Sequence, residues 1–253
     1  MTALTLSDVS RNFGGVQALS NVSFAVQAGE RRLIIGPNGA GKTTLFNIVA
    51  GAIAASAGTV ALFGRDITAL SAHRRARMGV SRTFQITNLF PRLTVEENVL
   101  LALQATESGA FSLLRRMRGN RKLFDRTDAL LQEWNLSAIA GREAREISYG
   151  EKRQVDLILA MALKPRVLLL DEPTAGLSAA EVVHVVGMIR GLPRQTTVLM
   201  IEHDVDVAFD LADRIAVLHQ GRLLAEGDPA SIRNDQRVAD IYLGEDEADA
   251  EPC

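Results

Sequence analysis

A glycine-rich stretch of the chain has the spacing of a phosphate-binding loop, G-x-x-x-x-G-K-[ST]. Its residues are Gly36, Pro37, Asn38, Gly39, Ala40, Gly41, Lys42 and Thr43. The glycines let backbone N–H groups face a phosphate at the start of a helix, whose dipole favours an anion. Lys42 would reach the β- and γ-phosphates, and the Thr43 hydroxyl would ligate Mg²⁺. We also expect Thr44, the next residue, to bind the nucleotide. A buried strand is expected before this stretch and an apolar helix after it, so a turn that merely opens a helix is the weaker interpretation.

Two acids, Asp171 and Glu172, follow four apolar residues, Val167–Leu170. A carboxylate at the end of a parallel strand that faces a phosphate loop can hold Mg²⁺ directly or through water. The adjacent Glu172 could orient and deprotonate an attacking water. Taken alone, the pair could equally be a solvated strand end, and the phosphate loop makes the chemical interpretation the stronger one.

A further signal is the S-x-x-E capping box formed by Ser148 and Glu151, which predicts the start of a helix. Because Gly150 has no side chain, it leaves the backbone beside this helix N-terminus uncovered. An uncovered backbone at a helix N-terminus would suit a phosphate. By itself this is an ordinary helix start. A second anion site in one chain makes sense if it serves the nucleotide of another subunit.

Strands and helices must position these residues. Alternation at Val22, Phe24 and Val26 predicts a half-buried strand. Short apolar runs predict further strands at 33–35, 58–64, 167–170 and 198–201, and helical patterns cover 154–163 and 181–190. This alternation predicts an α/β fold with a mostly parallel sheet.

The chain is expected to be a single domain, 1–253, with several parts. Residues 1–94 and 146–244 would form the α/β core, which includes an antiparallel β part. Residues 95–145 have helical composition and predict an inserted helical subdomain with breaks near Gly109 and Gly119. A hairpin turn is expected at Gln220-Gly221. The acidic tail at 245–253 is expected to fray.

Composition excludes several classes of protein. Hydrophobic residues make up 47% of the 253 residues and charged residues 23%, unlike a disordered chain. The net charge of −2 gives no global basic field of the kind typical of nucleic-acid binders. A single cysteine, Cys253, excludes an internal disulfide and a multi-cysteine metal site. Because the apolar runs are shorter than the roughly 18 residues of a membrane span and no signal-peptide layout begins the chain, we expect a soluble, cytoplasmic protein.

Together these motifs resemble the nucleotide-binding subunit of an ATP-binding cassette (ABC) transporter. The phosphate loop, Gln85, the signature 148–151, Asp171-Glu172 and His203 occur in the family's order, and the resemblance covers about 4–244. The strings 77–85 and 242–245 resemble the ATPases of branched-chain amino acid importers. The chain departs from the commonest pattern at Tyr149, where glycine is usual, and at Ser178, where aspartate is usual.

The resemblance implies roles for particular residues. Phe13 would stack on adenine, although a core phenylalanine after a strand is the alternative. Gln85 would contact Mg²⁺ and the attacking water while sensing the membrane subunit, and His203 would hold the γ-phosphate. Asp171 would ligate Mg²⁺, Glu172 would be the base, and residues 175–178 would cross a dimer interface.

The resemblance also implies partners. Two subunits, identical or different, would sandwich two ATP molecules with Mg²⁺, each ATP lying between one phosphate loop and the opposite signature with its Ser148 and Gly150. The pair would drive membrane-spanning permease subunits from the inner face of the cell membrane and would serve a solute-binding protein indirectly. Import of branched-chain or other amino acids fits best, and no nucleic acid is expected.

Alternative functions stay open at this point. Lipopolysaccharide export uses a similar ATPase, and some cassette ATPases act on DNA or ribosomes. A small-molecule kinase would leave the signature and His203 unexplained. A basic cluster is either a solvated helical face or a contact for lipid, a membrane subunit or nucleic acid. Its members are Arg115, Arg116, Arg118, Arg121, Lys122 and Arg126.

Overall fold

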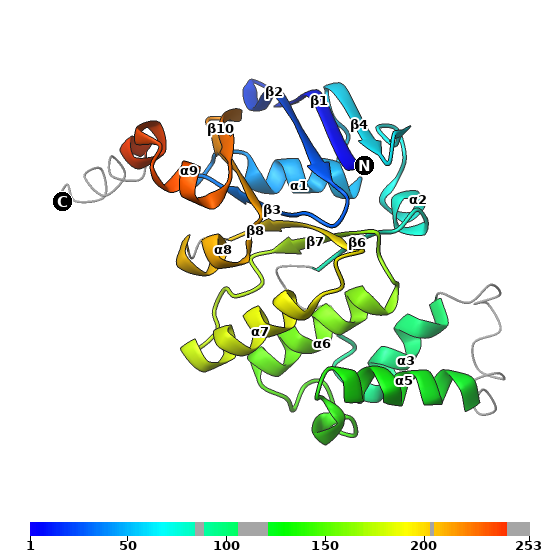
Figure 1. Cartoon of the computed structure of the whole chain (residues 1–253). Coiled ribbons are helices and arrows are strands. Elements are labelled where there is room, and N and C mark those ends of the chain that lie inside the picture. Colours follow the sequence, from blue (N-terminus) through cyan, green and yellow to red (C-terminus); the bar gives the residue numbers. More distant parts are fainter. Residues whose placement is uncertain (84–88, 106–120, 203–204, 242–253) are drawn as a thin grey trace.

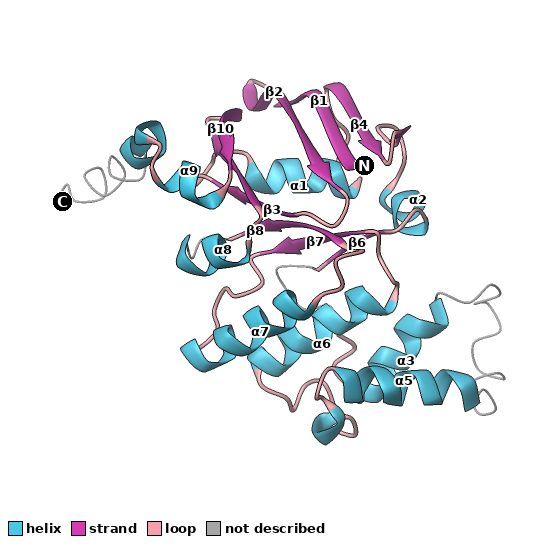
Figure 2. Ribbon diagram, in the orientation of Figure 1, coloured by secondary structure: helices cyan, strands magenta, loops and turns pink. Residues whose placement is uncertain are grey.

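The structure, a computed structural model, describes residues 1–83, 89–105, 121–202 and 205–241. Its larger sheet has six strands in the order β10-β9-β3-β8-β7-β6 (Figures 1 and 2). In that order the strands span Arg222–Gly227, Arg214–His219, Arg31–Ile35, Thr197–Ile201, Val167–Asp171 and Val80–Arg82. Neighbouring strands run parallel, except that β9 and β10 form the predicted antiparallel hairpin. The prediction of a mostly parallel α/β sheet is confirmed.

The strands β3, β8 and β7 are buried at every position. Parallel strands that are covered on both faces must be apolar throughout, which is why short apolar runs identified them in the sequence. Since all three run in the same direction, their carboxyl ends share one edge of the sheet. Ligands of open α/β sheets bind at that edge, and Gly36 and Glu172 follow β3 and β7 there.

A second, four-stranded sheet is antiparallel, with the order β2-β1-β4-β5. These strands span Val16–Gln27, Thr2–Phe13, Ala57–Leu62 and Arg65–Asp66. β4 ends at Leu62, short of the predicted bound, because Phe63 and Gly64 take left-handed backbone with φ of 47° and 78°. Those two residues form the turn into β5. This sheet is the antiparallel part that was expected.

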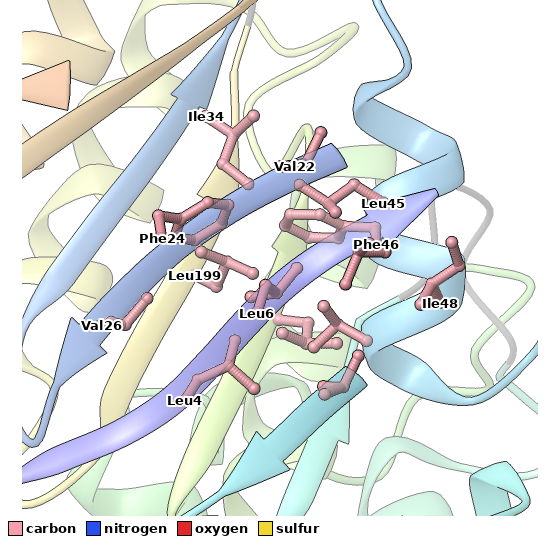
Figure 3. Close-up of a cluster of buried hydrophobic side chains, with 14 of the residues drawn as sticks. Leu4, Leu6, Val22, Phe24, Val26, Ile34, Leu45, Phe46, Ile48 and Leu199 are labelled. Carbon is pink, nitrogen blue, oxygen red and sulfur yellow. The ribbon is translucent and has the colours of Figure 1, made fainter. Parts of the chain in front are cut away.

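Helix α1 (Lys42–Ala50) lies between the two sheets (Figure 1). Figure 3 shows Leu6 and Phe24 of the antiparallel sheet close to Leu45 and Phe46 of α1, and all four side chains are buried. Full burial of a leucine or phenylalanine stabilises a fold by about 1.5–3 kcal/mol. The core therefore holds α1, and with it the loop that precedes it, firmly against both sheets.

The other face of the large sheet is covered by α6 (Tyr149–Ala162) and α7 (Ala179–Gly191) (Figure 2). Leu157 of α6 and Ile189 of α7 are buried with Leu168 and Met200 of the sheet. Two shorter helices, α8 (Val205–Leu211) and α9 (Pro229–Arg233), lie toward the end of the described chain. The predicted helices at 154–163 and 181–190 are confirmed.

A third apolar cluster belongs to the helical region, which follows the connecting helix α2 (Ala72–Arg77) and β6. It contains α3 (Val95–Ala105), α5 (Arg121–Glu133) and the short 3₁₀ helix η2 (Ser137–Ile139), packed on Val155 and Ile158 of α6. The predicted helical subdomain is confirmed, and the proposed domain bounds stay a prediction.

Some of the predictions for the helical region concern residues that the structure does not describe. Gly109, Gly119 and the first three arginines of the basic cluster lie outside the described residues. Arg121, Lys122 and Arg126 are exposed on α5, as a solvated helical face would be. Within the described ranges, no helix is both long enough and apolar enough to cross a membrane.

Candidate functional site

The phosphate loop connects the buried strand β3 to α1. Gly36 and Gly41 have positive φ, 149° and 98°. A Cβ on Gly36 would lie 2.0 Å from the Leu218 carbonyl oxygen, and one on Gly41 would lie 2.7 Å from the Ala18 carbonyl oxygen. Both positions therefore require glycine for their backbone conformation and for close packing.

The turn of the β9–β10 hairpin supports this loop. Gly221 donates its backbone N–H to the Ala40 carbonyl at 3.1 Å, and it accepts a bond from the Ser20 N–H at 2.8 Å. One turn thus ties the phosphate loop to β2. The sequence predicted the turn at Gln220-Gly221, and it carried no signal for this contact because the partners are distant in the chain.

Lys42 is buried, and its ammonium group bonds to the loop itself. Nζ donates to the Pro37 carbonyl at 2.9 Å and to the Gly36 carbonyl. A buried ammonium needs such partners because its desolvation costs several kcal/mol. The ammonium group that the sequence predicts to bind phosphates thus bonds here to carbonyls of the loop itself.

The N-terminus of α1 has no side-chain cap. Its N-cap residue is Gly41, which makes no capping hydrogen bond from a side chain, and no acidic residue lies in the first turn. The first N–H groups of a helix have no partner within the helix, and the helix dipole adds partial positive charge there. This end of α1 is suited to an anion.

A cavity of about 230 Å³ lies over the loop and brings Glu172 to it. Its lining comprises Ala18, Asn38, Gly39, Ala40, Gly41, Lys42, Thr43, Thr44 and Glu172. The structure thus places the predicted base beside the predicted phosphate site. No motif in the sequence marks Ala18, which comes from β2.

Glu172 has an unusual backbone conformation. Its φ is 47°, and its N–H donates to the Ile201 carbonyl of the neighbouring strand β8 at 3.0 Å. A residue other than glycine in this region costs about 1–3 kcal/mol, and such strain is concentrated at functional sites. The turn directs the chain out of β7 immediately after Asp171.

Asp171, the last residue of β7, is buried and paired with arginine. Arg82 Nη2 lies 2.6 Å from Asp171 Oδ2, and Arg82 Nη1 donates to Asn47 Oδ1 on α1, also at 2.6 Å. Near the adjacent strand end, Glu202 accepts bonds from the backbone N–H and the hydroxyl of Thr174. The partnership between Arg82 and Asp171 was not predicted.

The signature helix α6 begins as the capping box predicted. The Ser148 N–H donates to Glu151 Oε2 at 2.6 Å, and the Glu151 N–H donates to Ser148 Oγ at 3.1 Å. Tyr149 is exposed on the outside of the helix start.

Gly150 lies against a carboxylate from α7. A Cβ on Gly150 would lie 2.2 Å from Glu181 Oε1. Glu181 also accepts bonds from the hydroxyl and the N–H of Ser178. The Ser178 hydroxyl, the Ser178 N–H and the Gly150 N–H all lower the pKa of Glu181, the hydroxyl most. The backbone at Gly150, which is expected to meet a phosphate, therefore already has a carboxylate beside it.

The remaining predicted residues lie apart or outside the described chain. Phe13 ends β1 with 46% of its surface exposed, and the Arg11 guanidinium lies 4.5 Å from its ring centre. The alternative of a core phenylalanine is therefore wrong. Gln85 and His203 lie outside the described residues.

The comparisons with known proteins agree with these motifs. The sequence profile described as ABC transporter matches residues 19–175, and one described as branched-chain amino acid ATP-binding cassette transporter matches residues 222–248. The high-affinity branched-chain amino acid transport ATP-binding protein LivG of Salmonella typhimurium is 39% identical over 249 residues, which cover 96% of this chain and 98% of that protein.

Solved structures show the same architecture. A nucleotide-free ATP-binding cassette from an ABC transporter has a TM-score of 0.84 at 29% identity, and the match covers 96% of this chain and 99% of that one. A dimeric post-hydrolysis ATP-binding cassette bound to ADP and Pi has a TM-score of 0.74 at 26% identity, covering 89% and 98%. The chain therefore belongs to the ABC transporter family, as one of its ATP-binding subunits.

Proposed function

We propose that the chain binds MgATP at the cavity over the phosphate loop and hydrolyses it there. The observation that carries this proposal is the shared cavity, which joins Lys42 and Thr43 to Glu172. Lys42 would exchange its bonds to the loop carbonyls for the β- and γ-phosphates. The uncapped first turn of α1 would hold the same phosphates through its N–H groups.

Magnesium fits the donor groups at this site. Within the described ranges, no three histidine, cysteine, aspartate or glutamate side chains gather closely enough to hold a metal by themselves. Mg²⁺ is commonly held by one or two protein oxygens together with nucleotide phosphates. The Thr43 hydroxyl and the Asp171 carboxylate would supply those oxygens, with Gln85 as a further ligand. When bound, Mg²⁺ neutralises charge on the phosphates.

Glu172 would accept the proton of the attacking water, because its carboxylate belongs to the cavity that holds the phosphates. His203 would bond the γ-phosphate, and Phe13 would stack on adenine from the exposed end of β1. Ser148 and Gly150 would serve the ATP of a second subunit, since neither lines the cavity described for this chain.

We further propose that the transported solutes are branched-chain amino acids, taken up through permease subunits from a solute-binding protein. The chain would work at the inner face of the cell membrane. Support comes from the whole-length similarity to LivG and from the second profile at residues 222–248. Permeases and a second cassette are the general partners of this family.

Reconstitution into proteoliposomes tests this function. The chain is combined with the permease subunits and the solute-binding protein of a branched-chain amino acid importer and with radiolabelled leucine. We expect ATP-dependent leucine transport and its loss with Glu172→Gln, whose complex should still assemble. ATP hydrolysis that responds to lipopolysaccharide and not to leucine would favour the export alternative and contradict the proposal.

A further inference from the structure

Arg82 joins three elements of the nucleotide site. It is the last residue of β6, and its side chain is 14% exposed. Its Nη2 bonds to Asp171 at the end of β7, and its Nη1 bonds to Asn47 of α1. Pairing of β6 with β7 fixes its backbone, since Arg82 pairs with Leu169 and the next N–H, of Thr83, donates to the Leu169 carbonyl at 3.0 Å.

The position of Asn47 on α1 connects the Arg82 bridge to the proposed magnesium site. Asn47 lies four residues after Thr43, and residues at this spacing share one face of a helix. Asp171 and Thr43 are the two described residues proposed to hold Mg²⁺. The Arg82 guanidinium thus spans from the Asp171 carboxylate to the helix face that carries Thr43. Its planar fork suits a bridge of fixed geometry.

A second buried arginine provides a contrast. Arg75 of α2 also contacts α1, where it donates to the carbonyls of Ile48 and Val49. It donates as well to the carbonyls of Leu70 and Thr68. These bonds satisfy backbone oxygens at the end of α1 and touch no residue of the proposed metal site. Arg75 has a structural role, whereas Arg82 contacts a side chain with a proposed chemical role.

We infer that Arg82 is a positioning residue for the magnesium site. It holds Asp171 through Oδ2 and leaves Oδ1 for the metal or its water, and through Asn47 it sets the place of Asp171 relative to Thr43. This inference rests on the proposed function. Two effects oppose each other: the positive charge of Arg82 repels a metal ion, and its bonds orient the ligand. We expect orientation to dominate, because losing a partner that orients a metal ligand commonly weakens metal binding about 10- to 100-fold.

Manganese binding tests this inference without activity. Mn²⁺ replaces Mg²⁺, and electron paramagnetic resonance measures free Mn²⁺ as it is titrated into the full chain with saturating ADP. Arg82→Gln should raise the dissociation constant of Mn²⁺ about tenfold or more. Asn47→Ala should raise it less, and Arg82→Lys should fall between wild type and Arg82→Gln. Affinity for ADP in EDTA should stay unchanged in all three variants.

Arg75→Lys is the matched control. It should lower the melting temperature and leave the dissociation constant of Mn²⁺ at the wild-type value. Unchanged or tighter Mn²⁺ binding by Arg82→Gln would overturn the inference. If Arg82→Gln does not fold, Asn47→Ala and Arg82→Lys decide, and wild-type constants in both would overturn it. A wild-type chain that binds no Mn²⁺ with ADP would instead contradict the proposed function.

Discussion

Two helix N-termini are proposed to bind phosphate, and they differ in what already occupies them. The start of α1 has no side-chain cap and no acid in its first turn. The start of α6 has a complete capping box, and the Glu181 carboxylate from α7 lies beside its Gly150. A helix N-terminus that lacks a side-chain cap can bind an anion without displacing a capping side chain. We infer that α1 binds ATP first, and that α6 binds only when a second subunit presents a nucleotide that displaces the carboxylate.

Among changes at these two helix ends, the largest effect should come from blocking the start of α6. Ser148→Arg places a bulky cation at the signature and should lower hydrolysis by the assembled pair about 10²- to 10³-fold, the usual loss when a donor to the reacting phosphate or carbonyl is removed. ATP binding by the isolated chain, measured by calorimetry, should stay at the wild-type value. Asp228→Asn, which alters the cap of α9 outside the proposed nucleotide and interface residues, is the control for damage to a helix cap. Loss of binding by isolated Ser148→Arg would show that both helix ends serve one nucleotide.

The next largest effect should come from a change at the uncapped N-terminus of α1. Lys42→Ala removes the charged donor to the phosphates, and a hydrogen bond of this kind is worth about 1.5–3 kcal/mol. Calorimetry should therefore show ATP affinity reduced about 10- to 100-fold. Lys152→Ala, on α6, removes a lysine elsewhere and should leave the affinity unchanged. Equal ATP affinities of Lys42→Ala and wild type would show that the phosphate loop does not bind ATP as proposed.

A smaller effect is expected from the carboxylate on α6. Glu181→Gln keeps a hydrogen-bond acceptor and removes the negative charge beside the Gly150 N–H. Charges at a helix N-terminus are worth about 0.3–1 kcal/mol, so ATP-dependent dimers should form at roughly two- to fivefold lower ATP concentration. Asp228→Asn, which alters the cap of α9, is the matched control. Dimers that need more ATP with Glu181→Gln would show that the carboxylate assists closure.

The smallest effect is a pH dependence of stability. Hydrogen bonds from Ser178 lower the pKa of Glu181 below its ordinary value of 4.5. A carboxylate whose pKa is lowered by folding stabilises the fold above its ordinary pKa, and that stabilisation is lost as the pH falls through the lowered value. The melting temperatures of wild type and Glu181→Gln should therefore differ at pH 7 and converge in acid. A constant difference between pH 7 and pH 3 would contradict this assignment.

Much of the fold was predictable because its signals are local. The apolar runs that form β3, β7 and β8 and the S-x-x-E pattern at Ser148 act over a few residues. The order of strands in the sheets is set by contacts between distant segments, and no local pattern carries it. The support of the phosphate loop by Gly221 is of the same kind.

The site residues also divide into those marked by local sequence signals and those that depend on contacts between distant segments. Lys42, Asp171 and Glu172 could be found because their motifs are contiguous. The bond from Arg82 to Asp171 and the close approach of Glu181 to Gly150 join elements that only the packed fold brings together. The exposure of Phe13 also depends on the whole fold, since the end of β1 looks the same in sequence whether its ring is covered or exposed.

The ATP-dependent dimer of Glu172→Gln tests the central claim most directly, which is that α1 and α6 serve one nucleotide from two chains. This variant should bind ATP and hydrolyse it about 10²- to 10⁴-fold more slowly, so the closed pair should accumulate. Gel filtration with light scattering should show twice the chain mass of 27.4 kDa with ATP and the single mass with ADP. Adding Ser148→Arg should return the ATP sample to the single mass. A double variant that still dimerises with ATP would contradict the claim that α1 and α6 of two chains serve one nucleotide.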